Sequence, residues 1–161
     1  MIEMALDPWP QIRKGHKAHP VLTLQYLLRA HGHTVTPDDE FGPQTETAVR
    51  AFQTAKRLTV DGIAGPQTWQ ALVTTVRRGD RSDSVRAAQQ EFEYRSKPLL
   101  VVDGEFGPAT EDVVRRWQQF VKDRGETAMI VDGVVGPQTW QSLISGMYFF
   151  FPRTSEAGNA V

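Results

Sequence analysis

The chain contains the stretch Asp132-Gly133-Val134-Val135-Gly136-Pro137-Gln138-Thr139, and three close copies of it begin at Asp38, Asp61 and Asp103. The Asp-Gly half favours a tight turn, because aspartate can hydrogen-bond the backbone two residues on and glycine adopts positive φ without steric cost. The Gly-Pro half predicts a helix start, since the fixed φ of proline suits the first helical position. Each copy therefore predicts a loop that ends by starting a helix.

The four copies fall into two longer repeats. Residues 15–72 align with residues 79–143, and equivalent residues are 64 apart at the start, 65 apart in the middle and 71 apart at the end. These offsets indicate a one-residue insertion before Phe106 and a six-residue insertion within residues 122–131. Loops tolerate such changes in length. The sequence therefore predicts a tandem duplication of one small module.

The spacing of apolar residues predicts three helices in each repeat. They are expected at residues 18–31 and 82–94, from Pro43 and Pro108 onward, and as short helices from Pro66 and Pro137 onward. The short apolar runs at residues 99–102 and 129–131 are interpreted as extended segments, with a minimal strand pair as an option. Because helix dominates, the predicted fold class is all-α.

The predicted organisation is two three-helix modules that pack against each other. Module 1 is placed at residues 9–75, module 2 at residues 76–146, and an aromatic segment with a flexible tail at residues 147–161. The joint at residues 74–78 contains no proline, glycine or serine, so a fixed pair is expected rather than two modules on a flexible link. Modules this small bury only about 60% of their chain surface, so mutual packing would help both.

Composition excludes several classes of function. The net charge of −1 gives no basic field for nucleic acid, and the absence of cysteine excludes disulfides and thiol chemistry. No apolar run reaches transmembrane length, so no membrane span is expected. Residues 1–10 lack the basic and apolar regions of a signal peptide, which leaves open cytoplasmic synthesis followed by another export route or incorporation into a particle.

No recognised set of catalytic or metal-binding residues is found in the sequence. The histidines at positions 16, 19, 31 and 33 do not have zinc spacing and do not recur in the second repeat. Glu46 and Glu111 are equivalent, but a glutamate in the first turn of a helix stabilises the helix dipole without any catalytic role. We therefore expect a binding protein that is not an enzyme and uses no metal or cofactor.

The repeated motifs together resemble a known family. Their order is Leu-Gln, Asp-Gly-x-Phe-Gly-Pro-x-Thr, Ala-Val-x-x-Phe-Gln and Asp-Gly-x-x-Gly-Pro-x-Thr-Trp-x-x-Leu, at residues 24–72 and, with changes, at residues 89–143. This order resembles the small three-helix peptidoglycan-binding domain that accompanies many bacterial and phage cell-wall hydrolases. Asp39 departs from the pattern, because it stands where the other three phrases have glycine.

The resemblance implies non-catalytic binding of peptidoglycan, by which the chain targets or anchors a protein at the cell envelope or outside the cell. Candidate ligand residues are polar side chains of the second and third helices, with two tryptophans that could stack on sugars: Arg50, Gln53, Gln67, Trp69, Gln70, Arg115, Gln118, Gln138, Trp140 and Gln141. Core packing is the favoured interpretation of Trp69 and Trp140. Gln53 and Gln118 could equally cap a loop backbone.

Two alternatives stay open. The chain could be a structural or adaptor component of a phage or secretion-type assembly, or the partner of a separate cell-wall hydrolase. Such a contact would use the aromatic segment Met147, Tyr148, Phe149, Phe150 and Phe151, because an exposed aromatic patch is seldom left uncovered. The less favoured alternative is a small cell-wall hydrolase within the repeats themselves.

Overall fold

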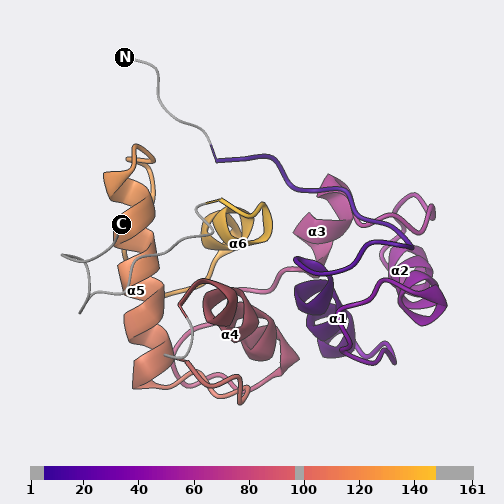
Figure 1. Cartoon of the computed structure of the whole chain (residues 1–161), viewed down its shortest axis with the longest axis horizontal. Coiled ribbons are helices and arrows are strands. Elements are labelled where there is room, and N and C mark those ends of the chain that lie inside the picture. Colours follow the sequence, from indigo (N-terminus) through magenta and orange to yellow (C-terminus); the bar gives the residue numbers. More distant parts are fainter. Residues whose placement is uncertain (1–5, 97–99, 148–161) are drawn as a thin grey trace.

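The computed structural model describes residues 6–96 and 100–147, which form six helices (Figure 1). The first module holds α1 (Val21–Ala30), α2 (Pro43–Ala55) and α3 (Pro66–Leu72). The second module holds α4 (Asp83–Ser96), α5 (Pro108–Asp123) and α6 (Pro137–Ile144). The predicted all-α fold of two tandem three-helix modules is confirmed.

Four helices begin at the proline of a repeated phrase, as predicted. The residue before each proline is a glycine in an extended conformation, which brings the chain sharply into the helix. Proline is suited to this position because the first N–H groups of a helix have no partner within the helix. The phrase therefore sets the start of both later helices in each module.

The first helix of the chain begins three residues later than predicted, at Val21 rather than at residue 18. Ala18 has a φ of 69°, outside the helical region, and Pro20 immediately precedes the helix. His16 and His19 therefore lie in the loop before α1 and do not share a helix face. The equivalent helix α4 begins at Asp83, one residue later than predicted, and it ends at Ser96, two residues beyond the predicted end.

Pairing of extended backbone is limited to isolated bridges in the described residues, and these recur between modules. Ile12 pairs with Ala64 as Val76 pairs with Val135, and Lys17 pairs with Glu40 as Arg81 pairs with Glu105. These bridges connect the start of each module to its two loops. The option of a strand pair between the two apolar runs is wrong for residues 100–102 and 129–131, which take part in none of these bridges; Leu99 lies outside the described residues.

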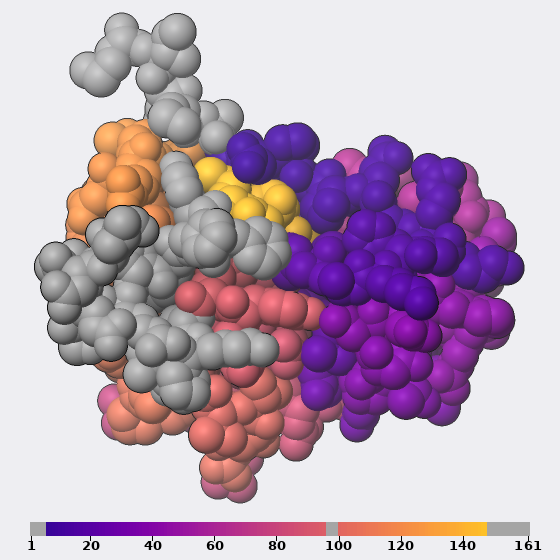
Figure 2. Space-filling view, in the orientation of Figure 1, coloured from indigo at the N-terminus to yellow at the C-terminus, as the bar shows by residue number. Residues whose placement is uncertain are grey.

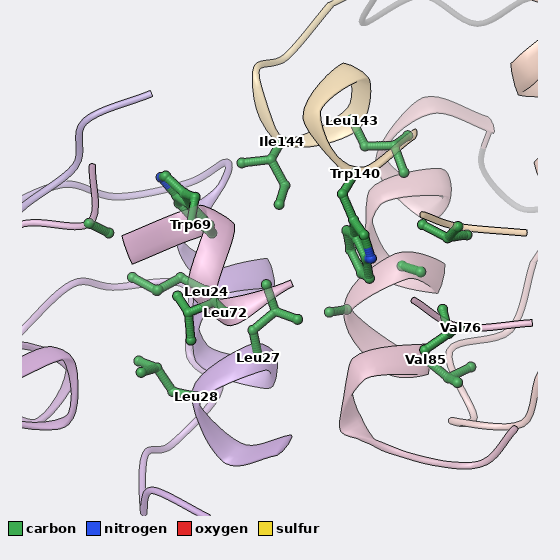
Figure 3. Close-up of a cluster of buried hydrophobic side chains, with 14 of the residues drawn as sticks. Leu24, Leu27, Leu28, Trp69, Leu72, Val76, Val85, Trp140, Leu143 and Ile144 are labelled. Atoms are coloured by element: carbon green, nitrogen blue, oxygen red, sulfur yellow. The ribbon is translucent and has the colours of Figure 1, made fainter. Parts of the chain in front are cut away.

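A large tryptophan occupies the core of each module. Trp69 and Trp140 are fully buried, and each donates its indole N–H to a backbone carbonyl of the segment that enters its module, at Pro10 (3.0 Å) and Thr74 (2.9 Å) respectively. Figure 3 shows aliphatic side chains gathered near the two rings, among them Leu24, Leu72 and Leu143. These tryptophans hold the entry segment of each module in place.

The two modules meet where α1 and α4 lie side by side at the centre of the molecule (Figure 1). Ile144 of α6 is fully buried and lies between the two clusters of core side chains (Figure 3). The hydrophobic core is therefore continuous from one module to the other, which accounts for the packed pair expected from the short joint.

A buried carboxylate, Glu91 of α4, lies in this interface. His19 Nε2 is 2.9 Å from Oε1 and 3.0 Å from Oε2, and the Thr23 hydroxyl donates to Oε2. Arg95 Nη1 donates to Oε1 at 2.8 Å. Burial alone would raise the pKa of Glu91, but its interactions with His19, Arg95 and Thr23 lower that pKa below the ordinary value. The ionised carboxylate thus joins donors from both modules.

The internal repeat places this polar cluster where the first module has an apolar core residue. Glu91 is equivalent to Leu27, a core residue of the first module. Arg95 is equivalent to His31, and the two hold equivalent backbone carbonyls: His31 Nε2 is 2.9 Å from the oxygen of Leu72, and Arg95 Nη2 is 2.8 Å from that of Leu143. One module therefore uses an imidazole where the other uses a guanidinium that also binds Glu91.

Asp39 makes a second polar contact between the modules. Its φ is 67°, close to the values of 73° to 80° at the glycines of the other three phrases. Its carboxylate accepts the backbone N–H of Leu22 at 3.2 Å and the hydroxyl of Tyr94 from the other module at 3.1 Å. The strained position is therefore occupied by a side chain that ties the first loop to both α1 and α4.

Candidate functional site

Each repeated phrase is held by one buried glutamine from the helix before it. Gln118 Nε2 lies 3.0 Å from Asp132 Oδ1, 2.9 Å from the carbonyl oxygen of Val134 and 3.1 Å from Thr139 Oγ1. Gln118 Oε1 accepts the N–H groups of Asp132 at 3.0 Å and Gly133 at 2.9 Å. The side-chain amide therefore binds nearly the whole phrase.

The same arrangement recurs in two of the other phrases and, with one N–H bond fewer, in the first phrase, with distances between 2.8 and 3.2 Å. The glutamines concerned are Gln25, Gln53 and Gln89. The repeating structural unit is thus a phrase together with its glutamine, and it fixes the loop beside each helix start.

These contacts also stabilise the ionised form of the first aspartate in three phrases. The side chain of Gln25 and the N–H of Glu40 lower the pKa of Asp38. The N–H of Ile63 and the side chain of Gln53 lower the pKa of Asp61, although partial burial opposes them. The N–H of Glu105 and the side chain of Gln89 do the same for Asp103.

These lowered pKa values predict a loss of stability in acid. A carboxylate with a lowered folded-state pKa contributes stability that is complete above its ordinary pKa of 3.8 and is lost as the pH falls through the folded-state pKa. We expect the urea midpoint of the wild type to decrease below about pH 4. In the variant Asp61→Asn/Asp103→Asn this decrease should be smaller, because asparagine can keep the turn but does not titrate.

Urea unfolding at a series of pH values between about 2 and 7 tests this expectation. Asp123→Asn is the control, since that aspartate lies at the exposed end of α5 and accepts one bond from Gln119. An unchanged acid slope in the double variant would contradict the assignment.

A shallow groove lies between the second loop and the third helix of each module. The groove of the first module measures about 240 Å³, and Asp61, Gln67 and Thr68 are among its lining residues. The groove of the second module measures about 200 Å³, and every residue that lines it is equivalent to a lining residue of the first. The duplication has therefore kept this groove in both modules.

The predicted ligand residues are divided by the structure into three groups. Gln67 and Gln138 line the two equivalent grooves. Gln70, Gln138 and Gln141 line a further groove between the modules. The remaining six residues comprise four buried side chains and two exposed arginines.

Four of those six side chains are buried, which leaves them little surface for contact with a ligand. The indole rings of Trp69 and Trp140 lie in the core and cannot stack on sugars. Gln53 and Gln118 are also buried and cap the loop backbone, which is the alternative that the sequence left open. Gln53 also lines the first groove, at its buried side.

The two arginines are exposed, and each also contacts the glycine of a turn. A Cβ added to Gly62 would lie 3.0 Å from Nε of Arg50, and one added to Gly133 would lie 3.0 Å from Nε of Arg115. Each guanidinium therefore packs on the glycine of a turn. Neither arginine lines one of the equivalent grooves.

Sequence reasoning missed Asp61 and Asp132 as groove residues, because turn chemistry already explained them. It also missed Gln11, which lines the first groove from the entry segment. The sequence did contain a signal for the two aspartates, because Asp61 and Asp132 are equivalent residues of the two repeats. The placement of Gln11 depends on the bridge between Ile12 and Ala64, which no sequence pattern indicated.

Two further observations concern the other predictions. No group of three or more histidine, cysteine, aspartate or glutamate side chains that could hold a metal ion is found within residues 6–96 and 100–147. Over the same residues, no helix is long and apolar enough to span a membrane. Met147 is buried; its sulfur accepts the N–H of Asp7 in the N-terminal segment, and its carbonyl oxygen lies 3.4 Å from Nη2 of Arg95 in the second module. Residues 148–151 of the aromatic segment lie outside the described residues.

Comparison with known proteins agrees with this duplicated arrangement. The model of a family described as "Putative peptidoglycan binding domain" matches residues 18–72 and again residues 81–143, one match for each module. The chain belongs to this peptidoglycan-binding domain family. The two matches cover most of the chain and include both repeated loops of each module.

Individual relatives of this peptidoglycan-binding pair share only parts of their length with it. The chain is 36% identical over 64 residues to the zinc D-Ala-D-Ala carboxypeptidase of Streptomyces albus G, which covers 38% of this chain and 25% of that protein. A peptidoglycan-binding protein from Clostridioides difficile is 41% identical, covering 39% of this chain and 40% of its own, with a TM-score of 0.39.

A Burkholderia AP3 phage endolysin is 26% identical, covering 67% of this chain and 38% of its own, with a TM-score of 0.40. The chain therefore spans less than half the length of each of these relatives.

Proposed function

We propose that this chain binds peptidoglycan without cleaving it, and that it thereby targets or anchors a protein at the cell wall. The observation that carries the proposal is the groove beside the second loop, which both modules keep with equivalent lining residues. Membership of the family indicates that the ligand is peptidoglycan. The groove supplies amide, carboxylate and apolar surface for a ligand with polar edges. The proposed location is the cell envelope or the cell exterior.

The size of the grooves supports binding through both modules at once. Each measures about 200–240 Å³, below the range of about 300–1,000 Å³ that is typical of small-molecule sites. A single module should therefore bind weakly. Two sites held on one chain raise the apparent affinity for a polymer, because the second binding event is intramolecular.

The position of the equivalent glutamates favours binding over hydrolysis. Glu46 and Glu111 lie on different modules and in surface ion pairs, with Lys14 (4.0 Å) and Arg78 (3.6 Å) respectively. Hydrolysis of a glycosidic bond usually needs two carboxylates about 5–10 Å apart on either side of that bond. These two residues instead repeat one structural role at the starts of α2 and α5.

Co-sedimentation with purified peptidoglycan sacculi tests the proposed function. We expect the wild type to sediment with sacculi and to produce no clearing in a zymogram. The variant Gln67→Ala/Gln138→Ala should bind about tenfold more weakly, because loss of one hydrogen bond from each groove is worth about 0.5–1.5 kcal/mol per site.

Thr54→Ala/Gln119→Ala is a matched control, since both side chains are exposed on α2 and α5 and lie outside the grooves. The control should bind like the wild type. Absence of the wild type from the sacculus pellet, under conditions where an established wall binder sediments, would refute the proposed function. A cleared zone in the zymogram would refute its non-catalytic part.

A further inference from the structure

A larger groove lies between the modules, next to the N-terminal segment. That segment passes beside α6 and continues onto the first module, as the indigo surface in Figure 2 shows. The groove measures about 490 Å³, within the range typical of small-molecule sites. Its walls come from the N-terminal segment, from α3 and its C-cap, and from α6: Leu6, Trp9, Gln70, Val73, Gln138 and Gln141.

The amides in this groove keep hydrogen-bonding capacity for a ligand. Gln141 Nε2 donates to the carbonyl oxygen of Asp7 at 2.8 Å, and Gln138 Nε2 donates to that of Ala128 at 3.2 Å. Both side chains retain a carbonyl oxygen that can accept. The exposed amide of Gln70 makes no hydrogen bond to the residues that the structure describes, so it can both donate and accept.

The charge of the groove lining favours one of the two parts of peptidoglycan, the glycan strand, over the other, the stem peptide. Among residues 6–96 and 100–147, no charged side chain lines the inter-module groove, whereas Asp61 and Asp132 line the two smaller grooves. The glycan strand presents acetamido and hydroxyl groups, which pair with glutamine amides. A stem peptide carries carboxylates, and bringing a carboxylate into an uncharged site is unfavourable without a cationic partner.

The groove is also continuous with the site proposed above. Pro137 and Gln138 line both the inter-module groove and the groove of the second module. A polymer bound in one can therefore extend into the other. The walls are held in position without ligand, because the Glu91 cluster and the bond between Asp39 and Tyr94 fix the two modules to each other.

Building on the proposed function, we propose that the inter-module groove binds the glycan strand of peptidoglycan. It is a subsite that neither module possesses alone. Gln70 is its specificity residue, since its amide is directed to no other group of the described chain and lies on the wall that the first module supplies.

Isothermal titration of the full chain with two probes tests this proposal. The first probe is a glycan strand without carboxylates, a β-1,4-linked oligomer of N-acetylglucosamine, because strands released by an amidase would carry a free lactyl carboxylate on each muramic acid. The second probe is the free stem tetrapeptide. Gln70→Ala should raise the Kd for glycan strands about threefold to tenfold. Gln70→Glu should raise it at least as much, because it has the same shape but adds a charge. Neither variant should change binding of the tetrapeptide.

Gln119→Ala is the control for both probes, and a chemical-shift map with glycan strands should include the side-chain amides of Gln70, Gln138 and Gln141. Wild-type binding to sacculi with glycan affinity unchanged by both Gln70 variants would overturn this inference alone. A loss of tetrapeptide binding in those variants, with glycan binding unchanged, would also overturn it. Failure of the wild type to sediment with sacculi would overturn the proposed function as well.

Discussion

Replacing Glu91 by alanine is expected to lower the free energy of unfolding by about 3–5 kcal/mol, the usual cost of removing one partner from a buried ion pair. The substitution would leave His19 and Arg95 without the carboxylate that both contact, in the buried interface between α1 and α4. Because these donors come from different modules, the loss should also uncouple the modules. Two unfolding transitions are then expected in urea, where the wild type should show one.

Two comparison variants separate charge from packing in this cluster. Glu91→Gln keeps the shape and one acceptor, so it should cost less than alanine. Glu105→Ala removes a glutamate whose ion pair with Arg81 (3.5 Å) is largely exposed, and it should cost no more than about 1 kcal/mol. If Glu91→Ala proved as mild as Glu105→Ala, with a single transition, the cluster would not be what holds the modules together.

Gln118→Ala is expected to lower the free energy of unfolding by about 2–4 kcal/mol. The side chain binds five groups of one loop, and several of them, including the N–H of Gly133 and Thr139 Oγ1, are buried. The adjacent residue provides a close control. Gln119 is exposed and bonds only to Asp123 of the same helix among the described residues, so Gln119→Ala should change stability by no more than about 0.5 kcal/mol.

Gln118→Glu tests the direction of these hydrogen bonds. Glutamate has the same length, but its ionised form has no hydrogen to donate to the three oxygens that surround Nε2, one of them from the carboxylate of Asp132. At neutral pH this variant should be at least as unstable as the alanine variant. Acidification should restore part of its stability, because a protonated glutamate regains one donor. Wild-type stability of Gln118→Glu at neutral pH would show that the amide does not donate as described.

Local chemistry explains why the sequence predicted the architecture well. Proline after glycine specifies a helix start through backbone geometry alone, so Pro43, Pro66, Pro108 and Pro137 each begin a helix as predicted. The start of α1 carries no such phrase, and there the prediction was three residues early. The two insertions between the repeats could be located by aligning the chain with itself.

The candidate site was harder to predict because it depends on burial. A glutamine on a helix reads as a surface residue until its neighbours are known, and Gln53 and Gln118 prove to be enclosed by the loops they bind. A signal was present, since one glutamine precedes each of the four phrases. The Glu91 cluster also left a signal, because a charged residue stands at the position of Leu27, but its partners His19 and Thr23 come from the other repeat and have no fixed spacing to it.

Asp39 determines how far the two halves of the chain can be treated as copies. The hydroxyl of Tyr94 needs the carboxylate of the first phrase, and the equivalent positions in the other three phrases hold glycine, which has no side chain to offer. A protein built from two copies of either half would lose this contact together with the one between His19 and Glu91, because each contact needs one residue from each half. The two halves have therefore become complementary parts of one folding unit. Recombination in nature or in the laboratory should transfer both halves together.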